Sequence, residues 1–392
     1  MNVFLLGNGF DLQHGFPTKY INFLNVVNFL QNHYDESMKT VADVFSDSRL
    51  QEKDGWLVKS YEQLGWAYKG VKLRKEDVEQ IISESKNNFW FKYLVSTYNK
   101  DLGWIDFEKE IARVIEVLSD YFAYDDINFD NRWNENIEKR HILLKFPFLY
   151  EERKNVLSYG GKAYKIVDEY TIESIVGSNI YIINKEKIAD VFYEELKKFA
   201  TILKQYLLIF VDATVDYINQ IGLKSVSDQY INADAVITFN YTRVFEQLYS
   251  CEDIAHIHGK TTTFIVLGVN PDENDNLETI NTDFLWFKKY YQRVFWGTDK
   301  EFLKLYKSLP TKSKYSNGIT LHISGHSLDV TDSDILKKVI AVAKKVIIYY
   351  HDDTAVASYI KNMVAMYGKD GFDEIREHKD LEFKMNSSIG WG

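Results

Sequence analysis

The chain has 392 residues, of which 45% are hydrophobic and 15% aromatic, so it can bury one large core or two smaller ones and is not a disordered protein. Its 47 basic and 57 acidic residues give a formal net charge of −10, which opposes sequence-independent binding to nucleic acid through phosphate contacts. A single cysteine, Cys251, excludes an intrachain disulfide and a zinc cluster of paired cysteines, and it favours a reducing compartment.

The chain opens with a pattern typical of α/β proteins. Residues 3–6 form a continuous apolar run that ends at Gly7-Asn8-Gly9, as expected for a strand that is buried on both faces and followed by a tight loop. After Pro17-Thr18, apolar side chains recur at helical spacing from Tyr20 to Leu30. The predicted order is therefore strand, glycine loop, short linker and helix.

The middle of the chain has a different character. Strand signals become sparse from about residue 50, and long amphipathic helix patterns take over, most clearly over residues 107–122 and 188–206. We predict a mostly helical insertion over residues 51–223. The longest apolar run, residues 206–211, is too short to span a bilayer, and the N-terminus lacks the features of a signal peptide, so we expect a cytoplasmic protein without membrane contact.

Strand and helix signals alternate again in the last part of the chain. We predict strands at 235–239, 254–258, 264–267, 319–323 and 346–350, with helices at 245–248, within 283–309 and at 334–343. Such alternation is typical of a doubly wound, mostly parallel, Rossmann-like sheet. Residues 1–50 and 224–392 would form this nucleotide-binding core.

The glycine loop after the first predicted strand is the first candidate site. Glycines there let the backbone approach a phosphate and direct its N–H groups toward it, which makes Gly7, Asn8 and Gly9 candidate ligand-binding residues together with Asp11. A structural turn is the alternative, because the third glycine of the dinucleotide fingerprint is absent. Since a carboxylate repels a phosphate, we expect Asp11 to face a ribose hydroxyl, a base edge or a cation.

Two further candidates follow the next predicted strands. Asn240 comes directly after an apolar strand, where its amide could orient a ribose hydroxyl or a water, or could simply cap the following helix. His256 and His258 share one face of a strand, and imidazole is well suited to proton transfer near neutral pH. Half-buried structural histidines, or a metal pair completed by ligands from elsewhere, are the alternatives.

The last candidate is the segment Gly325-His326-Ser327-Leu328-Asp329, which follows a predicted strand and precedes a helix. Gly325 and Ser327 could bind an anion or a sugar hydroxyl there, or the segment could be a turn with Asp332 or Ser333 as the helix N-cap. All four candidate segments lie at the same end of predicted parallel strands. We therefore expect them to form one joint site at the carboxyl edge of the sheet.

These motifs resemble those of the bacteriophage abortive-infection AbiH family. The resemblance rests on the sequences Leu-Leu-Gly-Asn-Gly-Phe-Asp-Leu, His-Gly-Phe-Pro-Thr-Lys-Tyr, Thr-Phe-Asn-Tyr-Thr, His-Ile-His-Gly and Gly-His-Ser-Leu-Asp, at residues 5–12, 14–20, 238–242, 256–259 and 325–329. It implies a bacterial protein that acts in antiviral defence.

The order of the motifs is also similar to the NAD-binding pattern of sirtuins. This resemblance implies NAD as substrate or ligand, with Gly7 and Gly9 near its phosphates and Asn240 orienting the nicotinamide ribose. It also implies that His258 acts as a base toward a ribose hydroxyl. The residues that would hold the other half of the nucleotide are Gly325 and Ser327.

The chain departs from sirtuins at several positions. Thr242 stands where sirtuins have an aspartate, and Asn8 and Asp11 replace the alanine and serine of their first loop. The paired cysteines of the sirtuin zinc module are absent as well. Protein deacylation is therefore not expected, whereas NAD hydrolysis and nucleotide sensing both stay open.

Three functions fit the sequence. The leading hypothesis is a phage-defence effector that binds NAD or a related nucleotide and hydrolyses its glycosidic bond. A non-catalytic nucleotide sensor, whose helical insertion docks an unidentified phage or host trigger, is the alternative. A metal-dependent hydrolase or nuclease using His256 and His258 is the third, although the spacing assigns no metal ligands. A homo-oligomer is compatible with all three.

Overall fold

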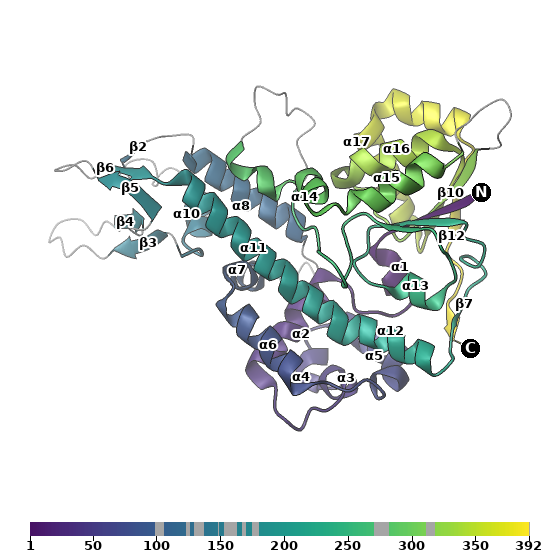
Figure 1. Cartoon of the computed structure of the whole chain (residues 1–392), viewed down its shortest axis with the longest axis horizontal. Helices are drawn as coiled ribbons and strands as arrows, with labels where there is room; N and C mark the ends of the chain where they lie inside the picture. The colour runs from purple at the N-terminus through teal and green to yellow at the C-terminus, as the bar shows by residue number, and fades with distance from the viewer. Residues whose placement is uncertain are drawn as a thin grey trace. The chain divides into compact units, whose positions relative to one another are not determined.

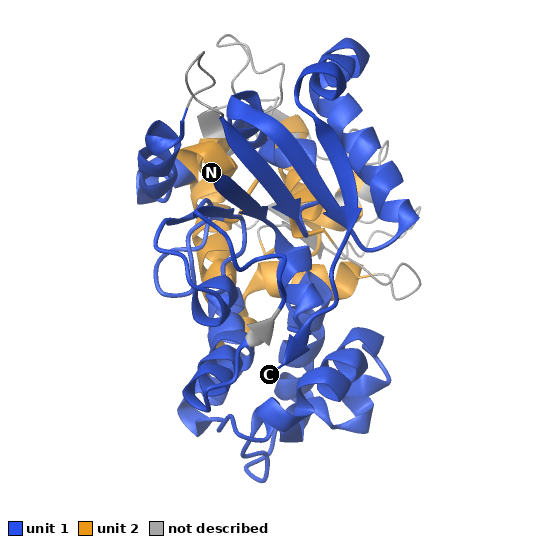
Figure 2. Cartoon of the chain, turned by 90° about the vertical axis from the view of Figure 1, so that its right-hand side faces the viewer, with its two compact units in different colours: residues 1–82, 202–266, 293–392 blue, residues 83–201, 267–292 orange. Residues whose placement is uncertain are grey.

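The computed structural model describes residues 1–98, 106–122, 126–128, 137–147, 149–152, 163–166, 170–174, 180–269, 282–310 and 318–391. The chain divides into two compact units, one of residues 1–82, 202–266 and 293–392 and one of residues 83–201 and 267–292 (Figure 2). The division that the sequence suggests, into a core and an insertion of residues 51–223, stays a prediction.

A six-stranded sheet forms the centre of the first unit (Figures 1 and 2). All its strands are parallel, and their order is β12-β11-β10-β1-β8-β9. The strands are β1 (Asn2–Leu6), β8 (Ala235–Thr238), β9 (Ile254–His256), β10 (Ile319–Ser324), β11 (Ala343–Tyr350) and β12 (Leu381–Met385). The sheet grows from β1 toward one edge through β8 and β9, and then toward the other through β10, β11 and β12. The prediction of a doubly wound, Rossmann-like sheet is confirmed.

Both faces of the sheet are covered, which explains why the central strands β1 and β8 are buried and mostly apolar. Helices α15 (Asp299–Ser308), α16 (Ser333–Val342) and α17 (Asp353–His378) supply side chains to one core, together with Leu5 and Ile237 of the central strands. On the opposite face, the ring of Phe4 stacks on His322 at 4.5 Å and lies 5.7 Å from Tyr230.

The segment after β1 differs from the sequence-based prediction. The strand is followed directly by a short helix, α1 (Asn8–Gln13), where we predicted a loop and a linker. Gly7 is extended at the start of this helix, and Gly15 ends it with a φ of +86°, while the Phe16 N–H donates to the Asp11 carbonyl at 3.0 Å. The helix between these two glycines has only six residues, too few for a periodic apolar pattern to reveal. The helix predicted from Tyr20 is confirmed as α2 (Tyr20–His33).

Two strand predictions need correction. Residues 264–267 form no strand, and only an isolated bridge joins Gly259 to Ile265, because Gly259 turns the chain back on itself with a φ of +74°. Strand β12 was not predicted, since its alternating sequence Leu-Glu-Phe-Lys-Met is that of a half-exposed edge strand with a weak apolar signal.

The long amphipathic helices of the middle segment are confirmed as α8 (Phe107–Phe122) and α11 (Lys185–Leu207). The other helices are α3 (Val41–Phe45), α4 (Ser48–Gln51), α5 (Gly55–Tyr68), α6 (Lys75–Asn87), α7 (Phe89–Thr97), α10 (Ile137–Leu143), α12 (Ala213–Gln220), α13 (Val244–Leu248) and α14 (Lys289–Trp296), with the turns η2 (Leu208–Asp212), η3 (Thr282–Phe287) and η4 (Val330–Asp332). Short antiparallel strands are β2 (Asp126–Asn128), β5 (Thr171–Ser174) and β6 (Ile180–Ile183), β3 (Leu149–Glu152) with β4 (Ala163–Ile166), and β7 (Ser225–Val226) with β13 (Gly390–Trp391). Within the ranges that the structure describes, no helix combines the length and apolar character needed to cross a bilayer.

Candidate functional site

Four loops follow the carboxyl ends of β1, β8, β9 and β10, and we call them the edge loops: residues 7–11, 239–243, 257–261 and 325–332. The strand order reverses between β1 and β10, which is the position where doubly wound sheets bind ligands. The edge loops contact one another through side chains and backbone. The structure therefore brings together the four segments that the sequence singled out.

The glycines of the first and fourth edge loops serve close backbone packing. The Gly7 N–H donates to the Ser324 carbonyl at 3.1 Å, and the Gly9 N–H donates to the Gly325 carbonyl at 2.8 Å. A Cβ on Gly9 would lie 2.6 Å from the Gly325 Cα, closer than two carbon atoms approach. These N–H groups are thus used within the protein, so in this arrangement they do not point at a phosphate.

Because backbone surrounds Gly9, a side chain there cannot be accommodated by a rotamer change. We expect Gly9→Ala to lower the free energy of unfolding by about 3 kcal/mol. A matched control is Gly55→Ala in α5, where an added Cβ meets nothing within 4 Å, and its expected effect is zero or slightly stabilising. Urea denaturation of both variants measures this, and equal stabilities would contradict the close packing of the two loops.

Asp11 lies in α1 and is the centre of the contacts between the first and second edge loops. Its side chain is only 1% exposed. Its Oδ1 accepts a hydrogen bond from the Asn240 amide at 3.0 Å, and its Oδ2 accepts one from the Thr242 hydroxyl at 2.6 Å. Burial raises the pKa of Asp11 to about 7, with a further increase from the charge of Asp212, although the bonds from Thr242 and Asn240 act in the opposite direction. Near neutral pH the Asp11 carboxyl is therefore close to half ionised.

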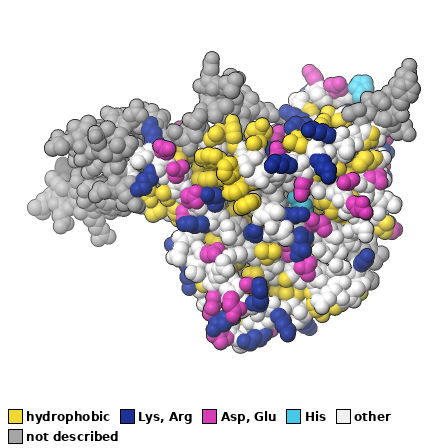
Figure 3. Space-filling view, viewed as in Figure 1, with side chains coloured by type: hydrophobic (Ala, Val, Ile, Leu, Met, Phe, Trp, Pro, Cys, Tyr) yellow, Lys and Arg dark blue, Asp and Glu magenta, His cyan; other side chains and the backbone are white. Residues whose placement is uncertain are grey.

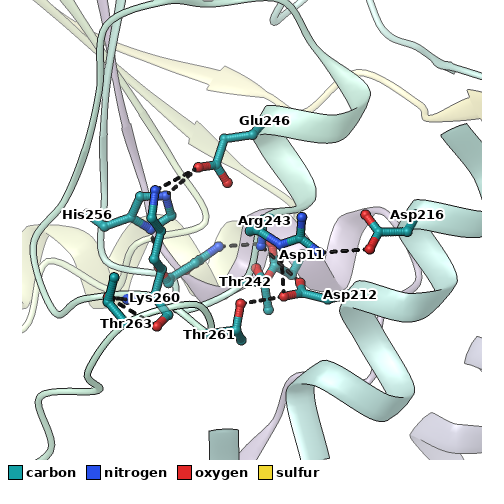
Figure 4. Close-up of polar contacts among 11 residues, drawn as sticks. Asp11, Asp212, Asp216, Thr242, Arg243, Glu246, His256, Lys260, Thr261 and Thr263 are labelled. Atoms are coloured by element: carbon teal, nitrogen blue, oxygen red, sulfur yellow. Dashed lines mark hydrogen bonds and ion pairs between the residues drawn. The ribbon is translucent and has the colours of Figure 1, made fainter. Parts of the chain in front are cut away.

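A second buried carboxylate, Asp212, comes from a part of the chain that the motifs did not indicate. It ends η2, a single π-helical turn between α11 and α12, and it is 1% exposed. It accepts hydrogen bonds from the Arg243 backbone at 3.0 Å, from the Arg243 Nε at 3.3 Å and from the Thr261 hydroxyl (Figure 4). Burial raises the pKa of Asp212 as well, and its hydrogen bonds with Thr261 and Arg243 oppose the increase.

The sequence does contain a signal for Asp212. It directly follows the apolar run of residues 206–211, and an acidic residue beside a buried helical stretch is expected to be paired. We placed it in the helical insertion, and only the fold shows that it reaches the edge loops.

His256 is held on both sides by protein groups. Its Nδ1 lies 3.1 Å from the backbone carbonyl of Asn240, and its Nε2 lies 3.1 Å from the Glu246 carboxylate, which also contacts Lys260 at 3.6 Å (Figure 4). These contacts fix the second edge loop against β9. Across the parts of the chain that the structure describes, no group of three or more histidine, cysteine or acidic side chains is arranged to hold a metal ion.

His258 belongs to a different cluster, formed with the fourth edge loop. Its Nε2 lies 3.3 Å from one oxygen of Asp332, and the Nε2 of His326 lies 3.4 Å from the other. The Leu328 N–H donates to the Nδ1 of His326 at 2.9 Å, so the proton of a neutral His326 is on the Nε2 that faces Asp332. The ring of Phe239 packs against His326 and His258 at 4.4 and 5.3 Å. Asp332 therefore joins two buried imidazoles, a role that the sequence did not reveal because Asp332 looked like a helix cap.

The remaining predicted residues lie at the rim. Asn8 and Ser327 are exposed, and the backbone of Ser327 accepts a hydrogen bond from Asn362 at 2.9 Å. Leu328 beside it is fully buried with a φ of +58°, an unusual conformation for a residue other than glycine. Strain of this kind is often found at functional sites.

A pocket lies beside Asn240, between the first two edge loops, α13 and β9. The side chains that line the pocket pack so closely that no space remains for a water molecule. The residues that line it are Phe10, Asp11, Thr238, Asn240, Thr242, Phe245, Glu246, Ile254 and His256. A ligand can therefore enter this pocket only if the edge loops move.

The distribution of charged side chains on the surface bears on nucleic-acid binding. On the face shown in Figure 3, lysine and arginine side chains are interspersed with acidic ones and form no continuous basic area among the described residues. A continuous basic surface is the usual feature of a nucleic-acid interface. This face therefore gives no support to nucleic-acid binding.

Comparison with known proteins identifies the family. The family model described as bacteriophage abortive infection AbiH matches residues 3–351, a range that includes all four edge loops. No curated protein and no solved structure matches the chain. Abortive infection is a bacterial defence against phage, so the family match gives the chain a role in that defence. The chain belongs to the bacteriophage abortive infection AbiH family.

Proposed function

We propose that this AbiH protein binds NAD or a related nucleotide at the edge loops and cleaves the bond between nicotinamide and ribose. Loss of NAD would then arrest an infected cell. The observation that supports the proposal is the position of Asn240 and His258, which lie on the edge loops after β8 and β9, at the carboxyl edge of a Rossmann-like sheet.

The contacts of the two side chains suit different roles. The Asn240 amide nitrogen is committed to Asp11, which leaves its Oδ1 to accept a hydrogen bond from a ribose hydroxyl or a water. The Nε2 of His258 lies 3.3 Å from Asp332, and a carboxylate close to an imidazole makes it a better base. In the proposed reaction, water attacks the anomeric carbon of the nicotinamide ribose and the carbon–nitrogen bond to nicotinamide breaks. The products are nicotinamide, ADP-ribose and a proton.

The closed pocket beside Asn240 also supports a second candidate, a nucleotide sensor without catalysis. A pocket without room for water, and a glycine loop whose N–H groups are used by protein carbonyls, fit a protein that changes conformation when it binds. Under both candidates the edge loops move on binding. The two differ in whether NAD is consumed.

The experiment measures NAD consumption by the purified protein, alone and with lysate of phage-infected cells. We expect consumption in the presence of lysate, and a decrease of about 100-fold or more in Asn240→Ala and His258→Ala. Asn32→Ala and His378→Ala are matched controls, because both side chains are exposed, and His378 ends α17 just before β12 begins, at the opposite edge of the sheet from the edge loops. Their activity should equal that of the wild type.

Two other results would contradict the proposed cleavage or the residues assigned to it. Binding of NAD without consumption in either condition, together with intact phage defence in Asn240→Ala, would favour the sensor. Consumption that persists in both variants would show that the reaction does not use these residues.

A further inference from the structure

Strand β12 has one edge that no other strand covers. Among the described residues it pairs only with β11, and it ends the six-stranded sheet (Figure 1). The carbonyl of Asp380 and the N–H of Asn386, which flank the strand, both bond to β11, at 3.3 and 2.8 Å. Because backbone groups alternate in direction along a strand, those that point away from the sheet belong to Leu381, Phe383 and Met385. A free edge of this kind can add another strand.

The side chains of β12 form an apolar row and a charged row. Successive side chains of a strand point to opposite faces, so Leu381, Phe383 and Met385 share one face, and Glu382 and Lys384 share the other. Met385 is 64% exposed, although it is large and apolar. The Lys384 ammonium lies 3.4 Å from the Glu382 carboxylate, and both side chains are more than one third exposed. The charged row is therefore accessible to a partner.

A groove of about 600 Å³ lies beside the apolar row, between β12 and α17. One of its walls includes Ile360 of α17, whose side chain is 38% exposed. The residues that line it are Ile360, Phe372, Asp373, Arg376, Glu377, Leu381 and Phe383. An apolar groove next to a free strand edge is typical of a surface that binds an extended segment.

We propose that β12 pairs with β12 of a second copy of this chain, antiparallel about a twofold axis at Phe383. In this register Leu381 lies opposite Met385 of the second copy, and the outward backbone groups of the two strands bond to each other. Glu382 lies opposite Lys384 of the second copy at both ends of the contact. These two charge pairs fall at positions without backbone hydrogen bonds, where facing Cα atoms are about 4.5 Å apart and side chains are closest.

The charges of β12 select this register. Moving the axis to Glu382 or to Lys384 would place that residue opposite its own copy, so that like charges would meet. With the axis at Phe383, every facing charge is opposite in sign. Lys345 of β11 lies 2.9 Å from Glu382 and continues the alternation of charge into the sheet. On the other face, Met385 of the second copy covers the apolar row beside the groove. The strand is therefore complementary to itself in backbone, apolar side chains and charge.

The test measures the mass of the full chain by analytical ultracentrifugation. We expect the wild type to form a dimer. Glu382→Lys and Lys384→Glu each place like charges opposite one another at both positions, so the dissociation constant of the dimer should rise at least about tenfold. The double variant Glu382→Lys/Lys384→Glu exchanges the two charges and should dimerise as the wild type does. Lys59→Glu, on the exposed side of α5, is the matched control and should keep the wild-type dimer.

Mixing the two single variants separates pairing from damage to the fold. In the mixture, one copy supplies only positive charges to the contact and the other only negative ones, so the two should form a heterodimer although each alone is monomeric. A heterodimer forms only if both variants are folded and the charges meet as proposed.

Three results would overturn the inference. A wild type that stays monomeric at up to ~100 µM would leave the free edge to an extended segment of another protein. A dimer that both single variants retain would mean that the copies meet through another surface. Single variants that fail to associate when mixed would show that their charges do not face each other. The inference is independent of the proposed function, because no nucleotide takes part in the pairing.

Discussion

Replacing Asp11 by asparagine is expected to stabilise the protein at pH 8 by about 2 kcal/mol, even though it alters a buried acidic side chain of the candidate site. In the folded protein the pKa of Asp11 is about 7, whereas its ordinary value is 3.8. The folded state therefore binds the proton more tightly than the unfolded state, and the wild type loses stability as the pH rises from about 4 to about 7. The full loss is on the order of 4 kcal/mol, and we expect about half to be recovered because the new amide is also buried.

The geometry allows this substitution. An asparagine at position 11 can accept a hydrogen bond from the Asn240 amide and donate one to the Thr242 hydroxyl, which replaces the two bonds of the wild type. Thermal and urea unfolding at pH 5 and pH 8 measure the effect, which should be larger at pH 8. Asp54→Asn is the control and should lower stability at both values, because Asp54 caps α5 and accepts bonds from Asn22 and Asn25. A loss of stability in Asp11→Asn at pH 8 would contradict the assignment of an isolated buried charge.

Replacing Asp212 by alanine should have the opposite effect, with a loss of about 3 kcal/mol in the free energy of unfolding. The Asp212 carboxylate accepts from the Arg243 backbone, the Arg243 guanidinium and the fully buried Thr261 hydroxyl. Alanine leaves those donors without their acceptor and leaves a cavity between α12 and the third edge loop.

Asp216→Ala provides the matched control for this change. Asp216 also contacts Arg243, at 2.8 Å, but its side chain is 48% exposed, so solvent screens the pair. We expect its loss to change stability by less than about 1 kcal/mol. If the two alanine variants were equally stable, the contacts of Asp212 would not contribute to the fold as the structure indicates.

The stability changes expected for Asp11→Asn and Asp212→Ala have opposite signs, and this difference bears on function. A buried carboxylate that stabilises the fold can be retained for its structure alone, whereas one that destabilises it suggests another reason for its presence. Asp11 lines the pocket beside Asn240, and Asp212 anchors a neighbouring loop. Greater stability in Asp11→Asn, combined with weaker phage defence, would identify Asp11 as a residue that the site requires.

The sequence by itself determined the class of fold and the segments that form the candidate site. The apolar runs that became β1, β8 and β11 are continuous because both faces of the sheet are covered, and glycine or polar residues mark the point where each strand ends. Such features are local, so a single sequence can reveal them. The short helix α1 was not predicted because its six residues make fewer than two helical turns, so no apolar pattern can repeat. The edge strand β12 was not predicted because a half-exposed strand has few apolar residues.

Only the tertiary structure decided which side chains meet. Asp11 and Asn240 are 229 residues apart in sequence, and their contact exists because β1 and β8 are neighbours in the sheet. The sequence likewise predicted His258 as a site residue. Its contact with Asp332 depends on the fold, which brings the loops after β9 and β10 to one edge of the sheet. Hydrogen bonds and ion pairs between distant segments depend on strand order and side-chain burial, and neither leaves a periodic pattern in the chain.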